Sequence, residues 1–166
     1  MSQGELLVEG RHRRWITLAV WFAVVAAVAL VGSAVTLPKI PTWYAGLAKP
    51  SFTPPNVVFG PVWTTLYVMM AVAVWRIAGD ASKEKTRAIV LFAIQLGCNA
   101  LWSPVFFGLE APKLGLATIC ALLVSLAITI AAFWRIDRLA ALLLAPYFAW
   151  VCYATALNAA IVALNR

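Results

Sequence analysis

Amide and aromatic side chains recur at helical spacing in the third long apolar stretch of the sequence. Four of them follow one another at intervals of four, three and four residues: Gln95, Asn99, Trp102 and Phe106. At about 100° per residue, they share one face of a helix. Because a buried amide needs a hydrogen-bond partner, we expect this face to point towards neighbouring helices.

The opposite face of the same predicted helix carries the small residues Ala93, Gly97 and Ala100. Small side chains allow two helices to approach closely within a membrane. The pattern therefore predicts a helix–helix interface on this face, either within the chain or across a homodimer.

Aromatic residues recur at helical spacing in two other apolar stretches. One carries Trp63, Tyr67 and Met70, and the other carries Tyr147, Trp150, Ala154 and Leu157. Three helices with aromatic rings at mid-depth predict a cavity for a large, flat, apolar ligand, whose rings would stack on Trp and Tyr. The alternative is inert aromatic core packing, in which Gln95 and Asn99 only bond neighbouring helices.

Residues for conventional catalysis or metal binding are scarce. His12 is the only histidine and lies in a basic run, and the three cysteines fall in three different apolar stretches: Cys98, Cys120 and Cys152. This spacing predicts no metal site, and the sequence has no phosphate-binding loop or nucleophile motif. All six acidic residues lie outside the apolar stretches, which disfavours an ion-coupled pump.

The elements that carry these residues are predicted to be membrane helices. The 166 residues are 64% hydrophobic and 11% charged, whereas soluble domains are roughly half apolar and a quarter charged. Five stretches can span a bilayer as helices: 15–37, 57–77, 87–109, 114–134 and 139–164. We therefore predict an all-α membrane protein, with a basic extension over residues 1–14 and a single five-helix domain over residues 15–166.

Basic residues are distributed unevenly between the two predicted ends of the bundle. Nine fall at the end with the amino terminus, namely Arg11, Arg13, Arg14, Arg76, Lys83, Lys85, Arg87, Arg135 and Arg138, and four fall at the other: Lys39, Lys49, Lys113 and Arg166. The positive-inside rule places the amino terminus inside, most simply in a bacterial cell membrane. The net charge of +7 is thus assigned to topology and lipid headgroups, and nucleic acid is not predicted as a partner.

Three stretches together resemble the translocator protein family, also called TspO/MBR, tryptophan-rich sensory protein or peripheral-type benzodiazepine receptor. They begin at Trp43, Gln95 and Leu144 and read WYAGLAKPSFTPPNVVFGPVW, QLGCNALWSPVFFG and LAPYFAWVCYATALNAAIVALN. The resemblance implies a five-helix bundle, often dimeric, with a ligand cavity beneath the loop between helices 1 and 2. Matching positions imply that these residues line it: Tyr44, Phe52, Pro54, Trp63, Asn99, Trp102, Tyr147, Trp150, Ala154 and Leu157. Tyr67, which shares a helix face with Trp63, is predicted to line the cavity as well.

The resemblance implies a binding protein for protoporphyrin IX, haem and other flat apolar ligands, acting as a tetrapyrrole sensor, scavenger or transporter without a required cofactor. Alternatives are light-dependent porphyrin breakdown involving Trp63 and Trp102, or lipid or sterol translocation. Two departures bear on these expectations. Phe52 stands where many bacterial relatives have Trp, and the carboxyl-terminal ATALNAAIVALNR lacks the aromatic residue of a proposed sterol motif.

The loop between the first two spans is predicted to be part of the site. Residues 47–63 read LAKPSFTPPNVVFGPVW, and the whole connection runs from Pro38 to about Asn56. Helices in bundles are usually joined by about 2–8 residues, and long ordered loops are often lids. Prolines stiffen this one. We predict a semi-rigid lid, from which Lys49 pairs with a ligand carboxylate such as a porphyrin propionate.

Overall fold

The computed structural model describes residues 3–166, with side chains described from His12 onward. Throughout this range the ordered elements are helices and none is a strand. They are α1 (Gln3–Thr36), the 3₁₀ turn η1 (Leu37–Lys39), the π-helical turn η2 (Ile40–Tyr44), α2 (Asn56–Ala78), α3 (Lys85–Ser103), the π-helical turn η3 (Pro104–Gly108), α4 (Pro112–Trp134), α5 (Arg138–Leu143) and α6 (Ala145–Leu164).

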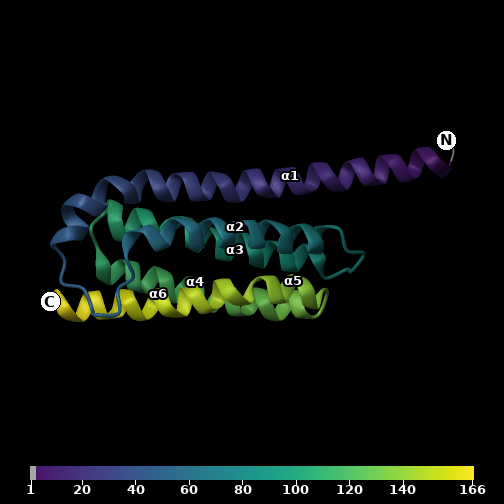
Figure 1. Cartoon of the computed structure of the whole chain (residues 1–166). Helices are drawn as coiled ribbons and strands as arrows, with labels where there is room; N and C mark the ends of the chain where they lie inside the picture. Colours follow the sequence, from purple (N-terminus) through teal and green to yellow (C-terminus); the bar gives the residue numbers. More distant parts are fainter. Residues whose placement is uncertain (1–2) are drawn as a thin grey trace.

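Five helical stretches are long and apolar enough to cross a membrane, which confirms the predicted bundle. Successive spans run antiparallel, as the ribbon shows (Figure 1). The amino end, the α2–α3 loop and the α4–α5 loop lie at one end of the bundle, and the α3–α4 loop and the carboxyl end lie at the other. We call these the amino end and the lid end. Antiparallel packing thus gathers the more basic connections at the amino end.

Helix α1 begins well before the predicted first span. It is continuous from Gln3, so the basic extension over residues 3–14 is helical, while residues 1 and 2 lie outside the described chain. Of its described side chains, only Val25 is fully buried. Helix α1 is therefore the most peripheral of the five spans.

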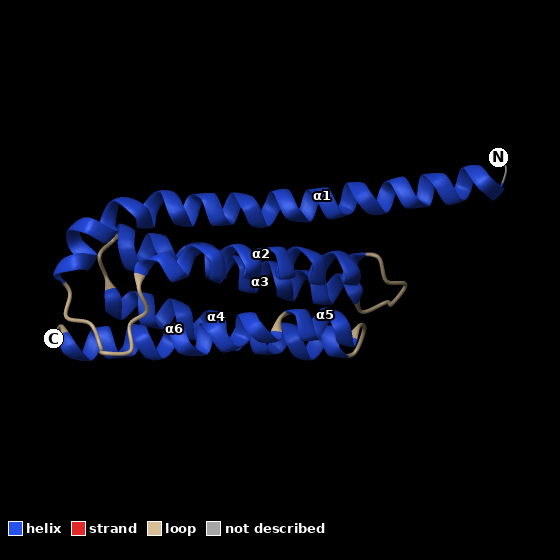
Figure 2. Cartoon of the chain, in the orientation of Figure 1, coloured by secondary structure: helices blue, strands red, loops and turns tan. Residues whose placement is uncertain are grey.

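The lid connection is shorter than the sequence suggested. Helical turns continue through η1 and η2, and irregular backbone is confined to residues 47–55, which we call the lid segment (Figure 2). Pro38 and Pro41 each stand within the first two positions of one of these turns. At both positions the hydrogen bonding changes from the α-helical to the 3₁₀ or π pattern, so the backbone stays helical although proline offers no N–H.

The last predicted span is interrupted at Leu144, between α5 and α6. Pro146 stands two residues later. A proline inside a helix has no N–H to donate to the carbonyl four residues earlier, and its ring clashes with that carbonyl. A break at this position is the expected result. The two pieces still form one membrane span, 138–164.

The half of the bundle near the amino end is solidly packed. Phe92 of α3 stacks on Phe133 of α4, with ring centroids 6.1 Å apart, and Trp21 of α1 contacts Phe92 edge-on at 5.7 Å. At the end of this half, Arg76 Nε donates to Asp137 Oδ2 at 2.7 Å. Large side chains fill this half, which leaves the lid half to accommodate a cavity.

Asp137 joins α2 and α5 at this end. Its Oδ1 accepts hydrogen bonds from the N–H groups of Leu139 and Ala140, which caps α5, while Oδ2 binds Arg76 of α2. Partial burial by itself raises the pKa of the carboxyl, but the hydrogen bonds from Ala140 and Arg76 outweigh it and hold that pKa below its usual value.

Candidate functional site

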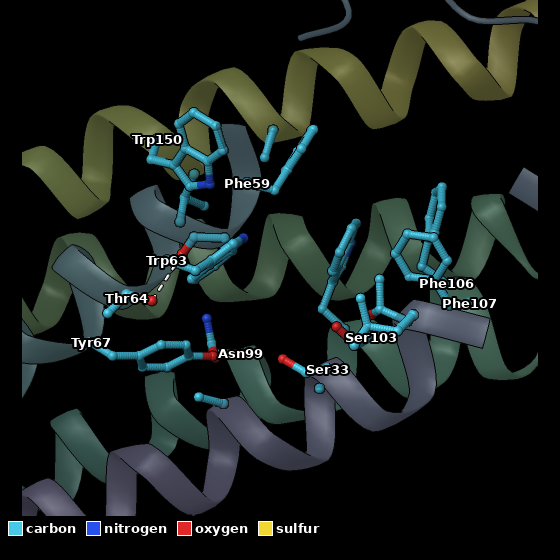
Figure 3. Close-up of a pocket in the computed structure, with 18 of the residues that line it drawn as sticks. Ser33, Phe59, Trp63, Thr64, Tyr67, Asn99, Ser103, Phe106, Phe107 and Trp150 are labelled. Atoms are coloured by element: carbon cyan, nitrogen blue, oxygen red, sulfur yellow. Dashed lines mark hydrogen bonds between the residues drawn. The ribbon is translucent and has the colours of Figure 1, made fainter. Parts of the chain in front are cut away.

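A cavity of about 580 Å³ occupies the lid half of the bundle (Figure 3). Its walls come from α1, η2, α2, α3, η3, α4 and α6. Eight of the residues predicted for the site line it: Tyr44, Trp63, Tyr67, Asn99, Trp102, Trp150, Ala154 and Leu157. Residues from all three aromatic stripes therefore border one space, whereas Met70 and Gln95 of the same stripes do not line it.

A hydrogen-bonded chain crosses the inner wall of the cavity. The Tyr67 hydroxyl donates to Asn99 Oδ1 at 2.8 Å, and Asn99 Nδ2 donates to the Tyr147 hydroxyl at 2.9 Å. Tyr147 does not itself line the cavity, because it is fully buried behind this wall. The chain joins α2, α3 and α6 and fixes the amide of Asn99 at the cavity surface.

A second amide orients Trp102. Trp102 Nε1 donates to Asn158 Oδ1 at 3.3 Å, and Asn158 Nδ2 donates to the carbonyl of Pro112 at 2.9 Å. The Trp102 ring stacks on Phe106, with centroids 5.0 Å apart. Asn158 was missed in the sequence, although it lies four residues after Ala154 on the same helix face.

Trp150 brings a hydrogen-bond donor to the cavity. Its ring lies edge-on to Phe59 at 5.7 Å, and its Nε1 is buried without a partner among the described residues. In the close-up, the indole lies on the wall opposite Asn99 and Tyr67 (Figure 3). A buried unpaired N–H is costly for as long as it has no acceptor. Gln95 also lacks partners for both amide atoms, but it lies in the core, away from the lining.

Small residues of α1 form a wall of the cavity that was not predicted from the sequence. Ala26, Ala29, Ser33 and Thr36 line the cavity at intervals of three, four and three residues. Ala26 and Ser33 are exposed, as are Thr64 and Val68 of α2, which also line it. The cavity is therefore open between α1 and α2, on a side that faces the membrane interior.

Besides Tyr147, three other residues predicted for the site lie outside the cavity lining. Phe52 is 49% exposed and contacts Tyr153 of α6, with centroids 6.2 Å apart. Pro54 is half-buried in the lid segment and does not reach the lining. Lys49 folds back within the lid: its Nζ donates to the carbonyls of Ala45 and Leu47 and lies 4.8 Å from the Tyr44 ring centroid. The connection between α1 and α2 contributes to the cavity through its helical turns instead, with Leu37 of η1 and with Ile40 and Tyr44 of η2.

The small face of α3 is left uncovered within the chain. Ala93 and Gly97 are exposed and Ala100 is half-buried, and a Cβ atom built on Gly97 meets no atom within 4 Å. The homodimer interface predicted for this face remains a prediction.

A bundle of five membrane-spanning helices around an aromatic cavity defines a multi-pass integral membrane protein. The sequence model of the TspO/MBR family matches residues 20–164, so the chain belongs to that family. It is 42% identical to the tryptophan-rich protein TspO of Chlorobaculum tepidum over 93% of this chain and 99% of that one. It is 43% identical to the Archaeoglobus fulgidus protein of the same name, over 85% and 92% of the two chains, and 44% identical to the human translocator protein over 70% of each.

Proposed function

We propose that the chain binds porphyrins, such as protoporphyrin IX and haem, and other flat apolar ligands in this cavity. It would thereby act as a tetrapyrrole sensor, scavenger or transporter. The observation that carries the proposal is the lining: three tryptophans and two tyrosines surround a space of about 580 Å³, and none of the acidic or basic side chains described from residue 12 onward lines it. Ligand cavities of roughly 300–1,000 Å³ suit molecules of this size.

The polar groups at the cavity suggest how a ligand is oriented. The macrocycle would stack on Trp63 and Trp102, while Trp150 Nε1 donates to a ligand nitrogen or oxygen. Because no cationic side chain in the described part of the chain lines the cavity, propionate groups would remain outside it. Lys49 has its amine engaged with Ala45 and Leu47, and Lys39 pairs with Glu110 at 2.6 Å.

A dark titration of the purified protein with protoporphyrin IX tests the proposal through quenching of tryptophan fluorescence. Saturable quenching is expected, with binding weakened roughly fivefold by Trp102→Phe and by Asn99→Ala, since a lost hydrogen bond is worth ~1 kcal/mol and a tenfold change in Kd needs ~1.4 kcal/mol. Trp134→Phe is the matched control, because Trp134 is 48% exposed and lies outside the cavity. Binding that is saturable yet unaffected by both cavity variants would remove this site.

The dimethyl ester of protoporphyrin IX tests the position of the propionates. The ester should bind at least as tightly as the free acid, because the acid gains no ion pair in the cavity. A free acid that binds tenfold more tightly, with the preference lost in Lys49→Met, would restore the predicted role of Lys49.

Light-dependent porphyrin breakdown is a second candidate, favoured by the position of Trp63 and Trp102 in the same cavity. In air and under illumination, porphyrin absorbance should then fall faster with the unmodified protein than with the Trp63→Phe/Trp102→Phe variant. Equal rates would remove this candidate. A sterol that displaces the porphyrin without being degraded would favour the translocator alternative.

A further inference from the structure

Tyr153 of α6 and Asn165, the residue that follows α6, hold the backbone of the lid segment at two points. Asn165 Oδ1 accepts a hydrogen bond from the Ala48 N–H at 3.0 Å, and Asn165 Nδ2 donates to the Ala48 carbonyl at 2.9 Å. The Tyr153 hydroxyl donates to the Phe52 carbonyl at 2.6 Å. Both partners are more than 100 residues away in sequence, so these contacts fix the lid segment to the far side of the bundle.

The Asn165 contact depends on the chemistry of an amide. One carboxamide supplies both an acceptor and a donor to a single residue, as a neighbouring peptide group does in a sheet. Its nitrogen also reaches the Ile161 carbonyl at 2.8 Å, at the end of α6. A carboxylate of the same shape keeps the acceptor for the Ala48 N–H, but it loses the donor and places negative charge against the Ala48 carbonyl.

The lid segment is pre-shaped between these two anchors. Lys49 donates to the Ala45 and Leu47 carbonyls, and Thr53 donates to the Pro50 carbonyl through both its N–H, at 3.0 Å, and its hydroxyl, at 2.8 Å. On either side of the segment, Tyr44 and Asn56 line the cavity. A segment with internal hydrogen bonds moves as a unit, so releasing its anchors frees the lid end of the cavity.

We infer that Asn165 is the positioning residue of the lid, with Tyr153 as its second anchor. Breaking the Asn165–Ala48 pair lets the lid segment leave α6 and opens the lid end. Ligand exchange through that end therefore depends on Asn165. This last step rests on the proposed function, whereas the position of the lid does not.

Hydrogen exchange over residues 45–53 tests the position of the lid without any ligand. Asn165→Ala loses both hydrogen bonds to Ala48, at ~1 kcal/mol each, and should raise the exchange rate of this segment about tenfold or more at pH 7. Asn165→Asp loses one of them and adds repulsion between its carboxylate and the Ala48 carbonyl, so exchange should rise at least roughly fivefold. At pH 4 and below, corrected for intrinsic exchange, protection should return in Asn165→Asp, because a protonated carboxyl again supplies one donor and one acceptor. Asn165→Ala should stay unprotected at both pH values. Wild-type protection in either variant at pH 7, or identical pH behaviour of the two, would overturn the inference.

The dissociation rate of protoporphyrin IX tests the route of exchange. Asn165→Asp should release the ligand about tenfold faster at pH 7, and Tyr153→Phe should add to this effect. A lid that exchanges hydrogen rapidly while dissociation is unchanged would mean that the ligand leaves between α1 and α2, which would overturn this part. Absence of any porphyrin binding would refute the proposed function alone, and hydrogen exchange would still decide the role of Asn165.

Discussion

Replacement of Asn99 by Leu separates the structural from the binding role of the inner cavity wall. Leu branches at Cγ as Asn does and is larger, so the change removes two hydrogen bonds without opening a hole. The fully buried Tyr147 loses its only partner among the described residues, and Tyr67 loses its acceptor. An orphaned buried polar group costs ~1–3 kcal/mol, whereas interhelical hydrogen bonds in membranes average ~0.6 kcal/mol. We therefore expect destabilisation of ~1–3 kcal/mol.

Thermal unfolding in detergent, followed by tryptophan fluorescence and far-ultraviolet circular dichroism, measures this effect. In a domain of this size, each 1 kcal/mol shifts the melting temperature by ~2–4 °C. The matched control is the variant Tyr67→Phe/Asn99→Leu/Tyr147→Phe, in which no hydroxyl is orphaned, because removing all partners of a buried network is far less costly than removing one. It should recover most of the lost stability while still binding porphyrin weakly. If it melts as low as Asn99→Leu alone, the orphaned hydroxyls are not the cause and the reasoning is refuted.

Two further predictions concern packing and pH. A Cβ on Gly115 would lie 2.8 Å from Phe106 Cδ2, so Gly115→Ala should cost ~1–3 kcal/mol by overpacking the cavity wall. Gly97→Ala, with open space around it, should be neutral or stabilising in the same melting experiment. Asp137, whose pKa is lowered, should contribute stability that is present above its unfolded pKa of about 3.9 and lost as pH falls through its lower folded value. The wild-type melting temperature should therefore fall below about pH 4, with a smaller fall in Asp137→Asn, and equal slopes would contradict the role of the Arg76 pair.

The sequence predicted the cavity because its signal is periodic. At helical spacing, Asn99 and Trp102 share a face of α3. Trp63 shares a face of α2 with Tyr67, and Trp150 shares a face of α6 with Ala154. A helix preserves such a face whatever surrounds it. The small stripe of α1 carries the same period, from Ala26 to Thr36. It was overlooked because alanine and serine are common in every membrane span.

The lid could not be predicted in the same way. Its residues follow no period, and its course is set by contacts with Tyr153 and Asn165, far away in the sequence. The resemblance to the family placed Phe52 in the cavity, but the hydrogen bond at its own carbonyl directs the ring onto Tyr153. The break at Leu144 could have been predicted from the sequence, because Pro146 lies in the interior of the predicted span.

The distribution of charge constrains which ligands this bundle can select. Both ion pairs among the described side chains lie at the ends, with Lys39–Glu110 near the lid and Arg76–Asp137 at the amino end. Between them, the cavity offers aromatic faces and a few neutral donors. Neutral donors in an apolar site distinguish ligands by where each ligand carries its hydrogen-bond acceptor. Leaving either the donor or the acceptor unpaired is costly there. Selectivity should therefore follow ring shape and the placement of one acceptor near Trp150, and should change little with the charge that a ligand carries at its rim.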